Sequence, residues 1–321
     1  MNFPVFDLHC DTALALLGKD YDTCGNLRNN EYHIDLDRAA ALPGYAQCFA
    51  CFTTTRQYRG NLSAIQIFER ELAAILNQIE SNSDRIALAY SAAQIEENRK
   101  NGVFSGILTI EGPAGIDFNP ELLEDLYKIG FRITTLGWNE SNPLTGSHIT
   151  GGGLTDLGRE YVAEAQRVGM LVDVSHISDE GFWDIMEITK APIIASHSNS
   201  RAVWNASRNL TDDMFRAICQ TGGVAGINLY NDFLGENVDL NTVRDHIEHF
   251  ISLDPTCTHI ALGGDLDGCE RLPKGFTGVQ DYPKLAQCLL DGGLNEQQVM
   301  NIFWNNAIGV IENAIHKHAE P

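Results

Sequence analysis

A histidine and an aspartate two positions apart end the first apolar run of the chain, in the stretch DLHCDT at residues 7–12. Side chains two apart on a strand point to the same side, roughly 6–7 Å apart along it, so His9 and Asp11 can reach one cation while Cys10 points elsewhere. Imidazole and carboxylate together suit zinc or another borderline divalent ion. Taken alone, the stretch is compatible either with half of a metal site or with a turn that happens to contain polar residues.

Other side chains that bind metals or move protons also follow apolar runs. Glu111 ends FSGILTIE, His176 follows MLVDVS, and His197 follows PIIAS. Asp265 and Asp267 occur in LGGDLDG, and an aspartate before a glycine, such as Asp267, also starts turns. The same combination of an apolar run and a polar end therefore recurs along the chain.

Five of these residues have the chemistry of metal ligands. A catalytic zinc that keeps an open position uses three protein ligands, so five are too many for one ion. Two ions roughly 3.5–4 Å apart, sharing one carboxylate and one hydroxide, would use them all. The candidate ligands are His9, Asp11, Glu111, His176 and His197.

The elements that must position these residues are short apolar runs alternating with amphipathic segments of helical length. Strands connected by helices run parallel, and eight such units predict a (β/α)8 TIM barrel better than an open doubly wound sheet. A small extra strand is expected at 85–91, and no Pro- or Ser-rich linker divides the chain. We therefore predict a single domain over residues 1–321 with a C-terminal helical region. The eight strands are expected to begin near Val5, Ala46, Gly106, Arg132, Leu171, Ile193, Val224 and Ile260.

In such barrels the active site lies at the C-terminal ends of the strands, where all of these candidates fall. Trp138 and Asn139 follow another strand in the same way, as do Asn228 and Tyr230. The remaining histidines lack the pattern and are predicted to be ordinary loop or surface residues, with two of them on the solvated face of a helix at 241–253. These histidines are His33, His148, His246, His249, His259, His316 and His318.

Composition and charge narrow the function classes. The formal net charge of −21 argues against a nucleic-acid partner and against anionic membrane surfaces. No run reaches 18 apolar residues, and no signal peptide is recognised, so a cytoplasmic location is expected. The eight cysteines are scattered, mostly in apolar stretches, and are predicted to be buried thiols; the CxxC of Cys48 and Cys51 is assigned to core packing.

Six ordered motifs resemble those of the renal (membrane) dipeptidase family, peptidase family M19, which contains zinc peptidases on a metal-dependent hydrolase barrel. Any one of them is modest evidence, but the ordered set spans most of the chain. The motifs are DLHCDT at 7–12, TIEGPAG at 109–115, GMLVDVSHIS at 169–178, PIIASHSNSRAV at 192–203, SRNLTDD at 207–213 and LGGDLDG at 262–268.

The resemblance implies a zinc-dependent dipeptidase with two zinc ions per chain. His9 and Asp11 would bind one ion, His176 and His197 the other, and Glu111 would bridge them. Asp265 would accept a proton from the attacking water and hand it to the leaving amine. Arg208, which alone would be read as a surface arginine, would grip the C-terminal carboxylate of a small dipeptide as a bidentate fork. The family's tolerance suggests that a D-residue at that position is also accepted.

One departure from the family pattern concerns the strand that begins near Arg132. Animal members carry a histidine in a TLTH motif there, whereas this chain has TTLGWNESN. The chain thus resembles the bacterial-type branch, and oxyanion stabilisation would fall to zinc, to Asn139 or to another donor. Trp138, Asn139 and Tyr230 join Arg208 as expected substrate-binding residues.

Two other functions stay open. The same site could belong to another amide hydrolase, such as an N-acyl amino acid deacylase, since both substrates can end in a carboxylate. A barrel that binds metal and ligand without turnover is the second alternative, although such a protein has no need of a proton shuttle like Asp265. The resemblance also implies a possible homodimer, since family members are often dimers. The apolar segment NIFWNNAIGVIENAI at 301–315 could pack on the barrel or on a partner.

Overall fold

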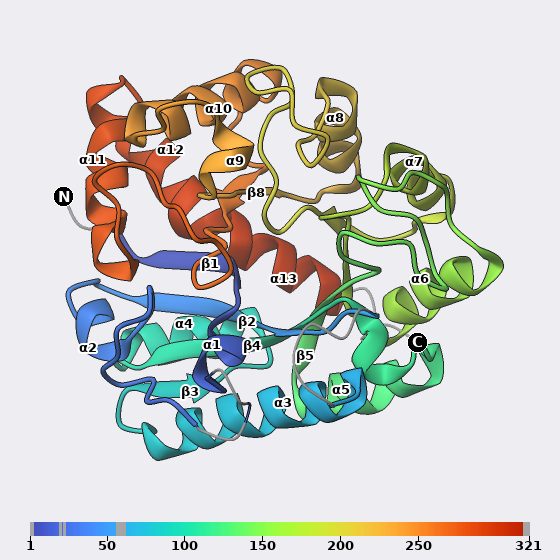
Figure 1. The fold of residues 1–321 in the computed structure, drawn as a ribbon. Coiled ribbons are helices and arrows are strands. Elements are labelled where there is room, and N and C mark those ends of the chain that lie inside the picture. The colour runs from blue at the N-terminus through green and yellow to red at the C-terminus, as the bar shows by residue number, and fades with distance from the viewer. Residues whose placement is uncertain (1–2, 19–20, 22–23, 56–61, 317–321) are drawn as a thin grey trace.

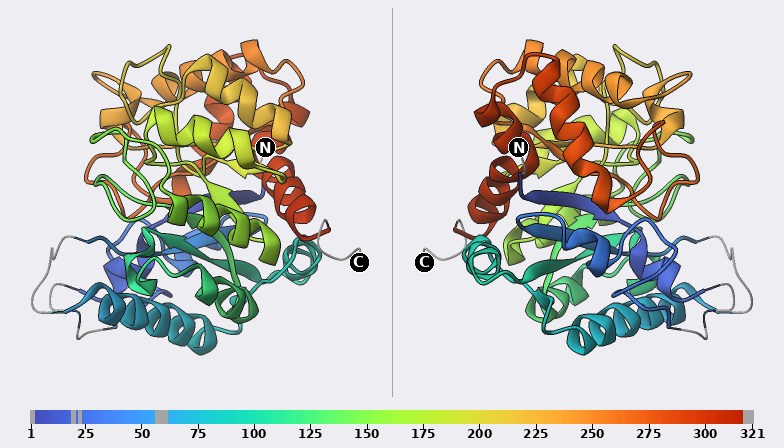
Figure 2. Two further views of the ribbon diagram at one scale, coloured as in Figure 1. Left: turned by 90° about the vertical axis from the view of Figure 1, so that its right-hand side faces the viewer. Right: turned by 90° about the vertical axis from the view of Figure 1, so that its left-hand side faces the viewer.

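Eight parallel strands form a nearly closed barrel with helices around it, as expected from the sequence (Figures 1 and 2). The computed structural model describes residues 3–18, 21, 24–55 and 62–316. Each barrel strand begins within two residues of its expected start. The strands are β1 Val5–Cys10, β2 Tyr45–Phe52, β4 Phe104–Glu111, β5 Phe131–Thr135, β6 Leu171–Asp173, β7 Ile193–Ile194, β8 Ala225–Ile227 and β9 Ile260–Leu262.

Hydrogen bonding runs around the barrel in the order β7-β6-β5-β4-β2-β1-β9-β8. The gap between β7 and β8 is bridged just beyond β7. The Ala195 N–H donates to the Val224 carbonyl at 3.0 Å, and the Ala195 carbonyl accepts from the Gly226 N–H at 2.8 Å. The extra strand, β3 Ile86–Leu88, pairs in parallel with the first residues of β4, Phe104–Gly106, and is not part of the ring. Both faces of the barrel strands are buried, which explains their nearly continuous apolar sequences.

Helices connect successive strands and cover the outside of the barrel (Figure 2). Several begin at a serine or threonine whose side chain accepts from the backbone N–H three residues on, as at Ser63, Thr155, Ser178 and Thr211. The helices before the C-terminal region are α1 Thr12–Leu16, α2 Leu36–Ala39, α3 Ala64–Ser81, α4 Ala92–Lys100, α5 Leu123–Ile129, α6 Asp156–Val168, α7 Asp179–Ile188, α8 Asp212–Thr221, α9 Asn231–Leu234, α10 Leu240–Leu253 and α11 Tyr282–Asp291.

The C-terminal region packs on the barrel, which is one of the two arrangements expected from the sequence. It comprises α12 Glu296–Met300, a π-helical turn Asn301–Asn305 and α13 Asn306–His316 (Figure 1). Trp304 and Val310 belong to one buried cluster with Phe6 of β1 and Ile107 of β4. Because Phe6 and Ile107 precede His9 and Glu111 on their strands, this segment covers the end of the barrel opposite the candidate ligands.

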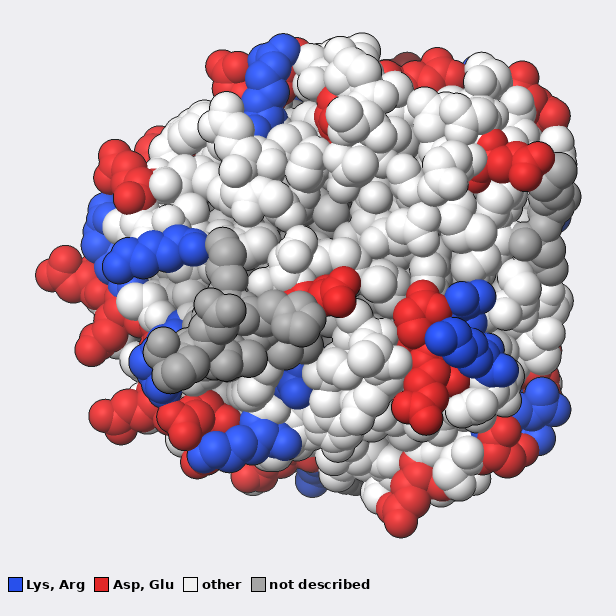
Figure 3. Space-filling view, turned by 180° about the vertical axis from the view of Figure 1, so that it is seen from behind, with Lys and Arg blue, Asp and Glu red and all other residues white. Residues whose placement is uncertain are grey.

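The surface carries charges of both signs. On the face in Figure 3, lysine and arginine side chains lie beside acidic ones, and no continuous basic surface is visible there. No described helix is both long and apolar enough to cross a membrane.

Two sequence predictions need correction. His246 is completely buried in α10, because its ring satisfies both nitrogens inside the protein: Nδ1 accepts from Ser200 N at 3.1 Å and Nε2 donates to the Leu234 carbonyl at 3.0 Å. His249, on the same helix, is half-buried and pairs with Asp212 at 2.8 Å. Of the eight cysteines, Cys10, Cys48, Cys51, Cys257 and Cys269 are buried as expected, whereas Cys24 is exposed and Cys219 and Cys288 are partly exposed.

Replacing His246 by leucine should lower the free energy of unfolding by about 1–3 kcal/mol, because the Ser200 N–H and the Leu234 carbonyl would lose their buried partner. The matched change on the same helix, His249→Leu, removes a partly exposed ion pair and should cost less than about 1 kcal/mol. Urea denaturation of the two variants measures the difference. Equal losses would contradict the structural role assigned to His246.

Candidate metal centre

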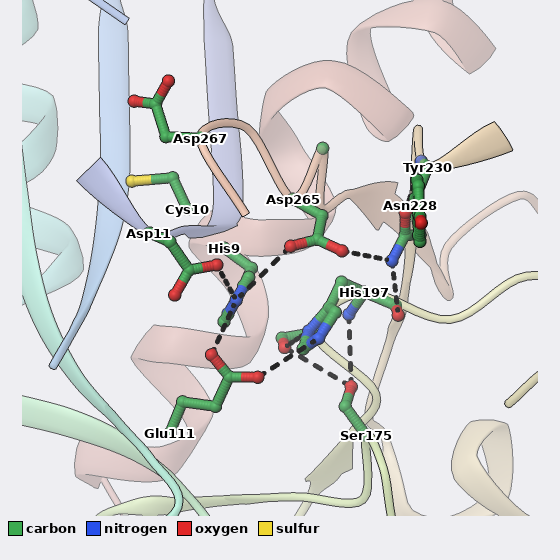
Figure 4. A network of polar contacts seen from close by, with 12 residues as sticks. His9, Cys10, Asp11, Glu111, Ser175, His197, Asn228, Tyr230, Asp265 and Asp267 are labelled. Atoms are coloured by element: carbon green, nitrogen blue, oxygen red, sulfur yellow. Dashed lines mark hydrogen bonds and ion pairs between the residues drawn. The ribbon is translucent and has the colours of Figure 1, made fainter. Parts of the chain in front are cut away.

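Polar side chains gather at the C-terminal ends of the strands. Glu111 is the last residue of β4, and His9 lies in β1 with Asp11 just beyond it. His176, His197 and Asp265 each lie three residues after the end of their strand. All six residues are at least nine-tenths buried, and each has a ligand atom within 3.9 Å of one from another residue of the group. Figure 4 shows His9, Asp11, Glu111, His197 and Asp265 turned toward one another. The structure therefore brings together every metal ligand expected from the sequence, and Asp265 with them.

The two oxygens of Glu111 face two different groups. Glu111 Oε2 lies 3.3 Å from His9 Nε2, which is 3.6 Å from Asp11 Oδ2 and 3.9 Å from Asp265 Oδ1. Glu111 Oε1 lies 3.0 Å from His176 Nε2 and 3.9 Å from His197 Nε2, and these two nitrogens are 2.9 Å apart. A single carboxylate thus separates a His9–Asp11 pair from a His176–His197 pair.

The donor atoms fit divalent cations. His9 Nε2 and Asp11 Oδ1 are buried and have no hydrogen-bond partner among the described residues, and buried polar atoms are rarely left without one. Donors at zinc's usual bond lengths in a tetrahedral site lie roughly 3.3 Å apart, close to the spacings around Glu111. The groups His9–Glu111–His197 and His9–Asp11–Asp265 each have ligand atoms within 4.8 Å of one another.

Burial and neighbouring charges together set the protonation of the site. Although burial acts to lower the pKa of His9, Glu111 and Asp11 raise it well above its usual range. Burial raises the pKa of Glu111 to about 7, with the Asp11 charge adding to the effect, and the pKa of Asp265 to about 6. It lowers the pKa of His176 and of His197 well below the usual range, so these imidazoles are neutral near pH 7 and can bind a cation through a nitrogen lone pair. A divalent cation would stabilise the ionised form of these two acids and would bind the free nitrogen lone pairs of these two imidazoles.

Two buried aspartates that sequence reasoning missed hold the ligand strands. Asp173 Oδ1 accepts from Ser175 N and Ser196 N at 2.9 Å each, and its other oxygen accepts from the Ser196 hydroxyl. Ser196 Oγ in turn lies 2.6 Å from His197 Nδ1, which fixes the ring with Nε2 facing the site. Asp7 Oδ1 accepts from His9 N at 3.0 Å and Gly264 N at 2.9 Å. An acid within an apolar strand, as in FDLH and LVDVSH, is the sequence signal that could have found both.

Local backbone geometry also shapes the site. His176 and Asp265 have positive φ angles of 69° and 56°, an uncommon conformation for residues with a side chain, and such strain often occurs at functional positions. An added Cβ at Gly268 would lie 2.0 Å from Asp11 Oδ2 and 2.5 Å from Asp265 Oδ1, so this glycine leaves room for both carboxylates. Asp265 Oδ2 accepts from Asn228 Nδ2 at 2.9 Å, which fixes its plane.

Arg208 is buried beside the site, not on the surface, with 4% of its area exposed. Its Nη1 donates to Ser198 Oγ at 2.6 Å, whereas Nε and Nη2 have no partner among the described residues. Its guanidinium also lies 5.8 Å from the centre of the Phe233 ring. Burial lowers the pKa of Arg208 to about 10, so the group stays charged at neutral pH. A buried cation with two unused donors is suited to an anionic ligand.

A pocket of about 370 Å³ opens onto Glu111, His176 and Asp265. The expected substrate-binding residues Trp138, Asn139 and Tyr230 all line it, with Leu14, Phe52 and Phe233. Trp138 packs edge-on against Phe52, with ring centres 5.2 Å apart. The pocket therefore joins an apolar wall to the polar cluster.

Three other residues near the site, Cys10, Asp267 and His148, have surroundings that differ from those of the candidate ligands. Cys10 Sγ lies 3.3 Å from Thr12 Oγ1 within the barrel wall, as strand alternation predicts, and points away from His9 (Figure 4). Asp267 accepts from the Thr12 hydroxyl at 2.6 Å and from His33 N at 2.5 Å, so it stabilises loops. His148, predicted to be an ordinary loop residue, lies beside the site: its Nε2 is 2.8 Å from Asn139 Oδ1. Only the fold of the glycine-rich loop at 141–155 brings it there.

The family to which the chain belongs follows from comparison with known proteins. The family model described as membrane dipeptidase, peptidase family M19, matches residues 1–320. The chain belongs to this family. It is thus a dipeptidase of the M19 metallopeptidases, enzymes that hydrolyse peptide bonds, and a metal cofactor is implied.

The chain is also similar to individual relatives and to solved structures. An uncharacterized protein of Klebsiella pneumoniae is 33% identical over 263 residues, covering 78% of this chain and 96% of that protein. An uncharacterized dipeptidase of Schizosaccharomyces pombe is 34% identical over 227 residues, covering 68% of this chain and 56% of that protein. A metallopeptidase from Rhodobacter sphaeroides, solved with a phosphinate mimic of the dipeptide L-Ala-D-Ala, is 26% identical with a TM-score of 0.87, covering 98% of this chain and 100% of that chain.

Replacing Glu111 by glutamine should stabilise the metal-free protein relative to the wild type increasingly as pH rises from about 4.3 to about 7, with little further change above that. The pKa of Glu111 is about 7 in the folded chain and about 4.3 in an unfolded chain. The folded wild type therefore loses stability as the carboxyl is forced to ionise, and the amide does not. Thermal unfolding after chelation measures this, and a difference between the two proteins that is constant over pH would contradict the prediction. Excess Zn²⁺ should reverse the order by stabilising the wild type more.

Proposed function

We propose that the chain is a zinc-dependent dipeptidase that binds two zinc ions and hydrolyses small free dipeptides. His9 and Asp11 would hold one ion and His176 and His197 the other, with one oxygen of Glu111 on each. The spacing of the donor atoms about the two Glu111 oxygens supports this division. A cytoplasmic location and a homodimer stay predictions from the sequence.

The observation that carries the proposal is the unused pair of donors on Arg208. A dipeptide places its C-terminal carboxylate one residue beyond the scissile bond, so it needs a cation at a fixed distance from the reacting centre. The buried guanidinium has Nε and Nη2 without partners, and Phe233 beside it lines the pocket. Nε and an Nη can bind both oxygens of a carboxylate together, which favours a free α-carboxylate as ligand.

The residues of the chain can share the steps of hydrolysis. Zinc, when bound, would polarise the substrate carbonyl and lower the pKa of a water molecule. Asp265 is held by Asn228 at 2.9 Å with its other oxygen toward His9, where it can accept a proton from the attacking water and return it to the leaving amine nitrogen. Arg208 would hold the carboxylate while this occurs, and Trp138, Phe52 and Tyr230 would shield the reaction from bulk water.

The pocket favours small substrates. It has a volume of about 370 Å³, and its aromatic wall would contact the side chain of the substrate's N-terminal residue. The Rhodobacter sphaeroides relative was solved with a mimic of L-Ala-D-Ala, which supports acceptance of LD as well as LL dipeptides by this chain. An N-acyl amino acid deacylase could use the same Arg208 contact, so the two reactions must be separated by experiment.

Purified, zinc-loaded protein should hydrolyse Ala-Ala and Ala-D-Ala, and should hydrolyse N-acetyl-alanine and Ala-Ala amide far more slowly. Arg208→Leu should raise KM for Ala-Ala about 10- to 150-fold, the worth of a charge-assisted hydrogen-bonded contact, and Arg208→Lys should recover only part of it. Steady-state kinetics on the four compounds measures both effects. Cleavage of the acylated compound alone would instead establish the deacylase.

Asp265→Asn should lower kcat for Ala-Ala by about 10²–10⁴-fold, the usual contribution of a general acid–base group, because the amide cannot accept the proton. The variant should still bind close to two zinc ions, measured by elemental analysis beside the wild type. An unchanged kcat would remove Asp265 from the mechanism. One zinc ion per wild-type chain would contradict the bridging role of Glu111.

A further inference from the structure

His148 makes three contacts that tie the glycine-rich loop to the site. Its Nε2 lies 2.8 Å from Asn139 Oδ1, and its Nδ1 lies 2.9 Å from Ser207 Oγ. Its backbone N–H donates to the His176 carbonyl at 2.9 Å. Asn139 Oδ1 is also 2.9 Å from His176 Nδ1. Asn139 Oδ1 therefore lies within hydrogen-bonding distance of two imidazole rings, and one of these rings belongs to His176, a candidate metal ligand.

The positions of the protons follow from this arrangement. His176 Nε2 faces Glu111 Oε1 at 3.0 Å and is the atom available to a cation, so the ring proton of neutral His176 lies on Nδ1. A proton on Nδ1 needs an acceptor, which is Asn139 Oδ1. His148 Nε2 lies against the same oxygen and must also carry a proton, since an oxygen offers only lone pairs. Both rings thus donate to Oδ1, and this excludes the flipped orientation of the carboxamide.

The fixed orientation leaves the NH₂ group of Asn139 available. Among the described residues none accepts a hydrogen bond from Asn139 Nδ2, and Asn139 lines the pocket together with Glu111, His176 and Asp265. A preorganised donor beside the reacting carbonyl stabilises the charge that develops on its oxygen. An asparagine that could rotate would present its oxygen half of the time and repel that charge.

We propose that His148 is a positioning residue for the dipeptidase reaction: it clamps the Asn139 carboxamide so that Nδ2 donates to the oxygen of the scissile carbonyl while Oδ1 orients the His176 ring. This inference rests on the proposed function. Ser207 extends the array to the segment that carries Arg208, since the two residues are adjacent. These contacts therefore connect Arg208, which would hold the substrate carboxylate, with Asn139, which would donate to the oxygen of the scissile carbonyl.

Two substitutions at His148 separate its contacts. Glutamine places an N–H where Nε2 lies and keeps the donor to Asn139, whereas asparagine reaches only the position of Nδ1 and keeps only the contact to Ser207. With Ala-Ala, His148→Asn and His148→Phe should lose about 10- to 100-fold in kcat, the usual effect of a residue behind a metal ligand, with KM changed less than about threefold. His148→Gln should retain most of the kcat. His249→Gln, on the outer helix α10, is the control and should match the wild type.

Two readouts besides turnover accompany these rates. Inhibition by a phosphinate dipeptide mimic, whose oxygen resembles the developing oxyanion, should weaken in His148→Phe and Asn139→Asp by about the factor lost in kcat/KM. Competition with a chelator should show zinc affinity reduced about 10-fold in His148→Phe, because the His176 ring would be held less firmly.

Wild-type kcat and inhibition in His148→Phe would overturn the proposal. Equal losses of kcat in the glutamine, asparagine and phenylalanine variants, accompanied by lower thermal stability, would show that His148 only stabilises the loop. This result would also overturn the proposal. If the wild type cleaves no dipeptide, the proposed function fails separately. The zinc affinity of His148→Phe then tests whether His148 positions Asn139 and His176, since an unchanged affinity would contradict this role.

Discussion

The buried carboxylate of Glu111 is the group on which the geometry of the candidate site depends. Its two oxygens lie 3.3 Å from His9 and 3.0 Å from His176, residues that come from opposite parts of the barrel. A carboxyl in this position is costly to ionise without positive charge nearby. Asp7 and Asp173 then act as supports, since each fixes backbone amides around a histidine that faces Glu111.

The barrel and most of the site residues could be predicted from the sequence for a simple reason. Each strand is a short apolar run, and the polar residues that matter follow these runs directly, so the topology alone places them at one rim. Strand alternation also directs Cys10 away from His9 correctly. The metal ligands themselves stay a prediction, but the structure gathers all five within hydrogen-bonding or ion-pair distance of a neighbour.

The residues that the sequence did not reveal depend on contacts between distant segments. His246 has the periodicity of a polar helix position, yet Ser200 and Leu234, which satisfy its ring, come from other loops. His148 lies in a glycine-rich loop whose path has no periodic signal, so its approach to Asn139 is a property of the folded loop. Arg208 was suggested by its motif, but its burial and its unused donors needed the three-dimensional structure.

The cover formed by Trp304 and α13 has a consequence for how the protein is made. β1, which carries His9, pairs with β9. The last described helix, α13, packs against β1 at the end of the barrel opposite the candidate ligands. During synthesis the first strand must wait for residues near 262 to complete the ring and for residues near 310 to cover it, and domains generally fold as units as the chain emerges. Any binding of a metal by all of the candidate ligands is therefore expected late in synthesis, since an incomplete nascent chain offers His9 and Asp11 without the histidines that face them.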